Sequence, residues 1–223
     1  KMSSQEELIG YTGENALEEY ISAHIEPEGD LLKSLYRETN IKLLNPRMAS
    51  GHIQGRLLKS FVQMIQPKNV LELGTFTGYA TLCMAEGLPE NGHIDTIEID
   101  DELEGFIKKW IDKSPYKDKI TLHIGDAVKV VPALNKKFDL VFLDAEKREY
   151  PDYYKQLFDY VELGGYIIAD NTLWDGHVVD PGYSKDRQTK AIKEFNDMVA
   201  ADSRVSVSIV PIRDGLTIIR RNI

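Results

Sequence analysis

Two hydrophobic patterns alternate along the chain from Val70 onward. Short runs rich in β-branched and aromatic residues predict strands, and apolar positions spaced three or four apart predict helices between them. The predicted strands are 70–73, 92–98, 120–124, 138–143 and 165–169, followed by 205–210 and 216–219. The predicted helices include positions 80–86, 106–110, 153–158 and 192–199, with a short helix from 126. Alternating strand–helix units indicate an α/β fold with a parallel sheet.

The two ends of the chain depart from this alternation. Arg213-Asp214-Gly215 separates the last two strands without a helix and is a strong hairpin signal. We therefore expect a doubly wound, mostly parallel sheet with a C-terminal antiparallel hairpin and N-terminal helices. Residues 5–45 carry helical stripes that pack either on the sheet or against a second subunit. No second core is visible, so we expect one domain over 1–223, with 1–47 as a helical lead-in and lid.

Composition limits the classes of function. The chain has 27 Lys and Arg against 36 Asp and Glu, a net charge of −9. This charge argues against indiscriminate binding to nucleic acid or anionic membranes, because both require a cationic surface. No apolar run reaches the roughly 20 residues that cross a bilayer, and residues 1–20 lack the apolar core of a signal peptide. Cys83 is the only cysteine, which favours a reducing compartment, so we expect a cytoplasmic protein.

A glycine turn follows the first predicted strand. Gly74 and Gly78 lie between that strand and the next helix, where open α/β sheets bind nucleotide-like ligands. Their spacing differs from the Gly-x-Gly-x-x-Gly of dinucleotide folds, which disfavours a nicotinamide dehydrogenase. Glu72 precedes the first glycine and suits a cationic ligand better than a phosphate. Glu98 ends the second strand, where a carboxylate accepts hydrogen bonds from a ribose diol. Asp126 follows the third strand and either meets an adenine amino group or caps the short helix.

Oxygen-bearing side chains also follow two strands that we expect to be neighbours. Asp144 follows strand 138–143, and Asp170 and Asn171 follow strand 165–169. Two carboxylates and one carboxamide suit Mg²⁺ and lack the thiolate and imidazole donors of structural zinc sites. The alternative is that Asp144 caps a helix and Asp170-Asn171 forms a turn. Lys147 is a candidate general base, because desolvation near a cation disfavours its charged form, and the alternative is an exposed lysine.

Three motifs in this order resemble the cation-dependent class I O-methyltransferases, the caffeoyl-CoA and catechol O-methyltransferase group. They are LELGTFTGY at Leu71–Tyr79, FDLVFLDAEK at Phe138–Lys147 and GGYIIADNTLWDG at Gly164–Gly176. The segment Pro211–Ile218 also resembles that family, so the resemblance runs from about Met48 to the end of the chain.

The resemblance implies a Rossmann-like fold that binds S-adenosyl-L-methionine and a divalent cation, with Mg²⁺ first and Mn²⁺ or Ca²⁺ as alternatives. The implied cosubstrate residues are Met48, Ser50, Glu72, Gly74, Phe76, Gly78, Thr81, Glu98, Asp126, Ala127 and Asp144. The implied metal ligands are Asp144, Asp170 and Asn171, the implied catalytic residues Lys147 and Asp144, and the implied substrate-side residues Lys147, Asn171 and Trp174. Two positions depart from the family pattern. Ala80 replaces a frequent serine, with Thr81 as the nearest hydroxyl, and His177 replaces a small residue.

The expected reaction is methyl transfer from the sulfonium to a hydroxyl of a small catechol-like phenol. A cation that binds two vicinal oxygens lowers the pKa of the hydroxyl, and Lys147 takes its proton. One alternative is O-methylation of a hydroxylated uridine in tRNA, which the net charge disfavours. Another is a non-catalytic S-adenosylmethionine-binding module. We expect a small phenolic substrate, no membrane partner and a homodimer, since relatives commonly form dimers.

Overall fold

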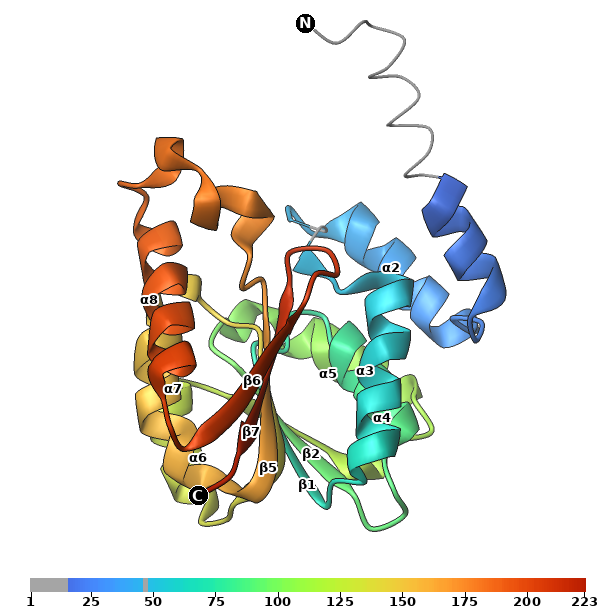
Figure 1. Ribbon diagram of the computed structural model, residues 1–223. Coiled ribbons are helices and arrows are strands. Elements are labelled where there is room, and N and C mark those ends of the chain that lie inside the picture. Colours follow the sequence, from blue (N-terminus) through green and yellow to red (C-terminus); the bar gives the residue numbers. More distant parts are fainter. Residues whose placement is uncertain (1–15, 46–47) are drawn as a thin grey trace, which may run out of the picture.

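The computed structural model describes residues 16–45 and 48–223, and its strands form one seven-stranded sheet (Figure 1). The strands are β1 (Asn69–Leu73), β2 (His93–Glu98), β3 (Ile120–Ile124), β4 (Phe138–Leu143), β5 (Val161–Asp170), β6 (Val205–Val210) and β7 (Leu216–Arg221). Their order in the sheet is β3-β2-β1-β4-β5-β7-β6. The first five pair in parallel, and β7 runs antiparallel to both β5 and β6. The predicted fold class is confirmed.

Strand β5 is longer than the sequence pattern predicts. It begins at Val161 rather than at Gly165, and its pairing with β4 shifts register between Phe138 and Leu140. Glu162 and Leu163 are exposed, and two glycines follow them. The first half of this strand therefore lacks a buried apolar run like the one that predicts its second half.

Helices cover both faces of the sheet (Figure 1). One face carries α2 (Asp30–Lys42), α3 (Gly51–Ile65), α4 (Tyr79–Gly87) and α5 (Glu104–Lys113). The other carries α6 (Ala127–Leu134), α7 (Tyr150–Leu157) and α8 (Arg187–Ala201). Because side chains alternate along a strand, Leu140 and Phe142 enter the first core and Val141 and Leu143 the second. Burial on both faces explains why the central strands read as continuous apolar runs.

The lead-in packs on its own chain. Leu32 and Leu35 of α2 are buried in the same core as α3 and α4, which is one of the two predicted alternatives. Helix α2 ends at Lys42. The predicted stripe near Leu8 lies outside the described residues. Within 16–45 and 48–223, no helix is long and apolar enough to cross a membrane.

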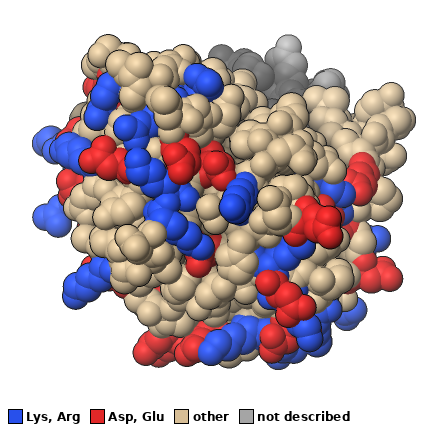
Figure 2. Space-filling model, turned by 90° about the horizontal axis from the view of Figure 1, so that it is seen from below, with Lys and Arg blue, Asp and Glu red and all other residues tan. Residues whose placement is uncertain are grey.

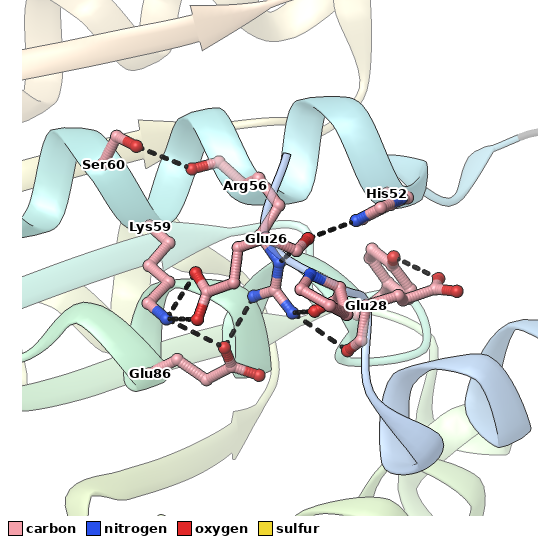
Figure 3. A network of polar contacts seen from close by, with 9 residues as sticks. Glu26, Glu28, His52, Arg56, Lys59, Ser60 and Glu86 are labelled. Carbon is pink, nitrogen blue, oxygen red and sulfur yellow. Dashed lines mark hydrogen bonds and ion pairs between the residues drawn. The ribbon is translucent and has the colours of Figure 1, made fainter. Parts of the chain in front are cut away.

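Arg56 fastens the segment between the helix at 16–24 and α2 onto α3 (Figure 3). Its buried guanidinium donates to Glu86 at 2.6 Å and to the backbone carbonyls of Glu26, Pro27 and Glu28. Tyr79, the first residue of α4, donates its hydroxyl to the Glu28 carboxylate at 2.5 Å. The lead-in is thereby tied to the helix that directly follows the glycine turn.

Charged side chains of both signs are intermixed on the face seen from below in Figure 2. In Figure 1 this is the side where the parallel strands begin, opposite the ends that carry the candidate site. Neither sign dominates this face, which agrees with the argument from net charge against non-specific binding of polyanions.

Candidate active site

Four adjacent strands have their carboxyl ends at the same level of the sheet. Leu73 of β1 pairs with Ile97 of β2 and with Leu143 of β4, which in turn pairs with Ala169 of β5. The residues that follow these four are Gly74, Glu98, Asp144 and Asp170. In a parallel sheet the register alone therefore brings together side chains that are far apart in sequence, at the edge where such sheets bind ligands.

The turn after β1 requires glycine. Gly74 has φ 91°, and a Cβ atom there would lie 2.0 Å from the backbone oxygen of Asp144. Gly78 has φ 87° and directly precedes α4. Between them, Phe76 has φ 52° and donates its N–H to the Glu98 carboxylate at 2.7 Å. The backbone therefore passes closely over the ends of β2 and β4 and leaves the N-terminus of α4 facing the site.

Glu72 is fully buried at the end of β1. Its Oε2 accepts hydrogen bonds from Thr81 and from Thr96, the latter at 2.7 Å, whereas Oε1 has no partner among the described residues. Burial raises the pKa of Glu72 to about 8, although the two hydroxyl groups act in the opposite direction. A buried carboxyl with one free oxygen is suited to a positively charged ligand group. The Thr81 hydroxyl serves Glu72, and its contact with a cosubstrate stays a prediction.

Glu98 and Asp126 are both held by backbone N–H groups. The Glu98 carboxylate accepts from Phe76 and, at 3.0 Å, from Asp100, so it is fixed beside the glycine turn. Asp126 caps α6 by accepting from the N–H of Val128 at 3.0 Å. Of the two predicted roles of Asp126, the structure shows the cap, and an adenine contact stays a prediction.

Three further predicted cosubstrate residues lie in the first turn of a helix or within three residues before one. Ala127 is buried in the first turn of α6. Ser50 is buried directly before α3, and Met48 is exposed two residues earlier. Ala80, the departure from the family pattern, is buried in the first turn of α4. The contacts of Met48, Ser50 and Ala127 with a cosubstrate stay predictions.

Asp144, Asp170 and Asn171 come together at the ends of β4 and β5. Asp170 is buried, and its carboxylate accepts from Gln54 Nε2 and from the backbone N–H of Asn171, each at 2.7 Å. Burial and the charge of Asp144 raise the pKa of Asp170 to about 7. Asn171 has φ 61°, and its Nδ2 donates to Asp214 at 3.2 Å. In the described ranges no group of three or more His, Cys, Asp or Glu side chains is arranged to hold a metal ion.

Lys147 is buried, so the alternative of an exposed lysine is wrong. Its Nζ donates to Asp144 Oδ1 at 2.9 Å, and to Ala145 O and the Tyr150 hydroxyl at 3.0 Å each. Burial lowers the pKa of Lys147, but Asp144 and Tyr150 outweigh it, and the net effect is a raised pKa. The lysine is therefore an ammonium here. The sequence argument disfavoured the charged form because it considered a nearby cation but not this ion pair.

Tyr150 and Gln54 belong to the site, and the sequence analysis missed both. The Tyr150 hydroxyl donates to the carbonyl oxygens of Leu143 and Asp170, at 3.2 and 2.9 Å, and so ties the end of β4 to that of β5. Gln54 had a usable signal, because a polar residue on the apolar face of a helix requires a buried partner. Tyr150 had none, since an aromatic residue in a helix normally indicates core packing.

The segment after Asn171 is built from short helical turns. Trp174 is half-buried against the core that contains α7 and α8, and its backbone N–H donates to the Asn171 carbonyl at 3.2 Å. His177 stacks on Tyr183 with ring centroids 3.5 Å apart. The histidine that departs from the family pattern is therefore part of a stacked pair within this segment.

Comparison with known proteins agrees with this fold. The model of a family described as O-methyltransferase matches residues 19–222. Caffeoyl-CoA O-methyltransferase 1 of Eucalyptus globulus is 35% identical over 184 residues, which cover 78% of this chain and 75% of that protein. The O-methyltransferase from Bacillus cereus, solved in complex with SAH, has a TM-score of 0.86 at 26% identity and covers 92% of this chain and 97% of its own. TomG from Streptomyces achromogenes, solved with SAM, has a TM-score of 0.85 at 26% identity, with 92% and 96% covered.

The sheet order, the glycine turn and these matches define the class, a Rossmann-like class I S-adenosylmethionine-dependent methyltransferase. Within that class, the chain belongs to the O-methyltransferase family. The predicted family resemblance is confirmed.

Proposed function

We propose that this O-methyltransferase transfers the methyl group of S-adenosyl-L-methionine to a hydroxyl of a small catechol-like phenol, with the help of a divalent cation. The acceptor class is supported by similarity to the Eucalyptus enzyme, which is named for caffeoyl-CoA. The caffeoyl group carries two adjacent phenolic hydroxyls. The observation that carries the proposal is the meeting of Asp144, Asp170 and Asn171 at neighbouring strand ends.

The residues present fit a hard divalent cation. Burial and the charge of Asp144 raise the pKa of Asp170, although Lys147, which pairs with Asp144, acts in the opposite direction. A further positive charge between the two carboxyls would therefore favour their ionised forms. With the amide oxygen of Asn171, they offer three oxygen donors, a set that suits Mg²⁺, Mn²⁺ or Ca²⁺. We infer that these three residues hold the ion. When bound, a divalent cation lowers the pKa of an acceptor hydroxyl by withdrawing charge from it.

The glycine turn and two glutamates are proposed to hold the cosubstrate. Glu72 offers a buried oxygen without a partner, which suits the cationic methionine end. Glu98, fixed by two backbone N–H groups, suits the ribose hydroxyls. Further proposed contacts come from Met48, Ser50, Gly74, Phe76, Gly78, Thr81, Asp126, Ala127 and Asp144.

Lys147 is the proposed proton acceptor. Burial lowers its pKa, and the Asp144 carboxylate is the main group that opposes this effect. A cation that shared the charge of Asp144 would leave Tyr150 as the other group that favours the ammonium and would shift the balance toward the neutral amine, the form that takes the proton of the acceptor hydroxyl. Trp174, close to Asn171 in sequence and joined to it by a hydrogen bond, is proposed to line the acceptor side.

Turnover of catechol with S-adenosyl-L-methionine tests this function, with S-adenosyl-homocysteine measured as product. We expect EDTA to abolish turnover and Mg²⁺ to restore it, and Asp144→Ala to lower it by more than about 100-fold, since even supporting residues of a metal site contribute 10- to 100-fold. Asp197→Ala, which removes an exposed carboxylate from α8, is the matched control and should leave turnover unchanged. A phenol with a single hydroxyl should be a poor acceptor. Turnover that is insensitive to both EDTA and Asp144→Ala would contradict the proposal.

The two alternative functions, the homodimer and the lid each have less support than the proposed reaction. The tRNA alternative and the non-catalytic alternative gain nothing from the relatives named above, which are described as O-methyltransferases. We retain a homodimer, and a lid formed by the lead-in of a single domain, as proposals. Sedimentation velocity of the full chain tests the first of these.

A further inference from the structure

The tip of the β6–β7 hairpin, residues 211–215, packs against the proposed cation site. The N–H groups of Thr172 and Leu173 donate to the carbonyl oxygens of Gly215 and Asp214, at 3.3 and 2.7 Å. Gly215 has φ 87°, and a Cβ atom there would lie 2.5 Å from the side chain of Leu173. The hairpin tip and the segment that follows β5 therefore form one closely packed unit.

Within this unit, Asp214 contacts the side chain of Asn171. Asn171 Nδ2 donates to Asp214 Oδ2 at 3.2 Å. A carboxylate only accepts hydrogen bonds, so the amide must present its NH₂ group to Asp214. An amide turned by 180° would set two oxygens against each other. The opposite end of the amide, Oδ1, is the one atom of this side chain that ligates a hard cation.

The neighbouring Arg213 connects the same turn to Asp170. Its Nη1 donates to the carbonyl oxygens of Ala49, at 3.1 Å, and Ser50, just before α3 begins. Gln54, one helical turn further on, lies 3.5 Å from the Ser50 hydroxyl and donates to Asp170 Oδ2 at 2.7 Å. The hairpin tip is thus linked to Asp170 and Asn171, the two proposed ligands at the end of β5.

We propose that Asp214 is a positioning residue for the divalent cation, because it orients the Asn171 amide with Oδ1 available to the ion. This inference rests on the proposed function. Asp214 acts only through Asn171 and does not touch the reacting atoms. Groups that orient a metal ligand in this way typically change metal affinity by 10- to 100-fold.

Mn²⁺ binding to the full chain without cosubstrate, measured by calorimetry, tests the proposal. Asp214→Ala should weaken Mn²⁺ binding by about 10- to 100-fold. Asp214→Asn should recover most of the affinity, because its side-chain oxygen still accepts from Asn171. Asp197→Ala, the matched loss of an exposed carboxylate, should bind Mn²⁺ as the wild type does. The affinity for S-adenosyl-homocysteine should stay within about twofold in all variants, since Asp214 contacts neither the glycine turn nor Glu98.

The outcomes separate this inference from the function on which it rests. Unchanged Mn²⁺ affinity in Asp214→Ala would overturn the role of Asp214 and leave the cation site in place. Parallel loss of Mn²⁺ and S-adenosyl-homocysteine affinity, or no recovery in Asp214→Asn, would also overturn it, because the hairpin tip would then act by general packing. No Mn²⁺ binding by the wild type would remove the proposed cation and this inference together. Thermal unfolding verifies that each variant is folded. If Asp214→Ala does not fold, Asp214→Glu, which displaces the carboxylate, is measured in its place.

Discussion

We expect Glu72→Gln to change how the stability of the protein depends on pH. The carboxyl of Glu72 is fully buried, and burial raises its pKa from the ordinary value of 4.5 to about 8, against the hydrogen bonds from Thr81 and Thr96. Between these two pH values the folded protein keeps a proton on Glu72 that the unfolded chain has released. The stability associated with this group is therefore fully present below pH 4.5 and is lost as pH rises through about 8.

The size of the effect follows from the shift in pKa. A rise from 4.5 to about 8 corresponds to about 5 kcal/mol between the two ends of this range. Glutamine has nearly the same shape, keeps an oxygen for both threonine hydroxyls and does not titrate. At pH 5 the variant should match the wild type or be less stable by about 1–3 kcal/mol, because its NH₂ group replaces an oxygen that already lacks a partner. At pH 9 the variant should be the more stable protein.

Urea unfolding of the ligand-free protein, followed by circular dichroism from pH 5 to pH 9, measures this difference. Asp170, which also has a raised pKa, is present in both proteins, so its contribution cancels when one curve is subtracted from the other. Glu90→Gln, which replaces an exposed carboxyl, is the control and should follow the wild type. Wild-type and Glu72→Gln curves that run parallel within about 1 kcal/mol would refute the reasoning.

Two other substitutions test the packing around the site. Gly74→Ala should lower the free energy of unfolding by about 3 kcal/mol or more and abolish S-adenosyl-homocysteine binding, because its Cβ would clash with Asp144 at a positive φ. The control Gly105→Ala lies on an open helix surface and should instead raise the free energy of unfolding by about 0.5–1 kcal/mol. Equal effects of the two variants in urea unfolding would contradict the steric argument. Arg56→Ala should cost about 2–3 kcal/mol by the same measurement, since the Pro27 and Glu28 carbonyls lose this donor. Glu86 keeps its ion pair with Lys59 at 3.5 Å. Arg56→Lys should recover only part of this loss, because an ammonium lacks the planar fork of donors, and full recovery would show that charge alone suffices.

The order of strands and helices was predictable because it depends on local patterns. The central strands are buried on both faces, so β1 and β4 read as apolar runs, and the Arg213-Asp214-Gly215 turn marks the closing hairpin. Residues at strand ends could also be named, because the carboxyl edge of a parallel sheet gathers them at one place. Gly74, Glu98, Asp144 and Asp170 all occupy such positions.

Only the tertiary structure decided the state of these groups. Whether Lys147 is charged depends on Asp144 and Tyr150, and the second of these looks like an ordinary core residue in the sequence. The partners of Asp170 and Asn171, which are Gln54 and Asp214, lie 116 and 43 residues away along the chain. A local pattern records which face of an element is apolar and where the element ends. Hydrogen-bond partners and pKa values depend instead on distances between elements, and those distances exist only once the chain has folded.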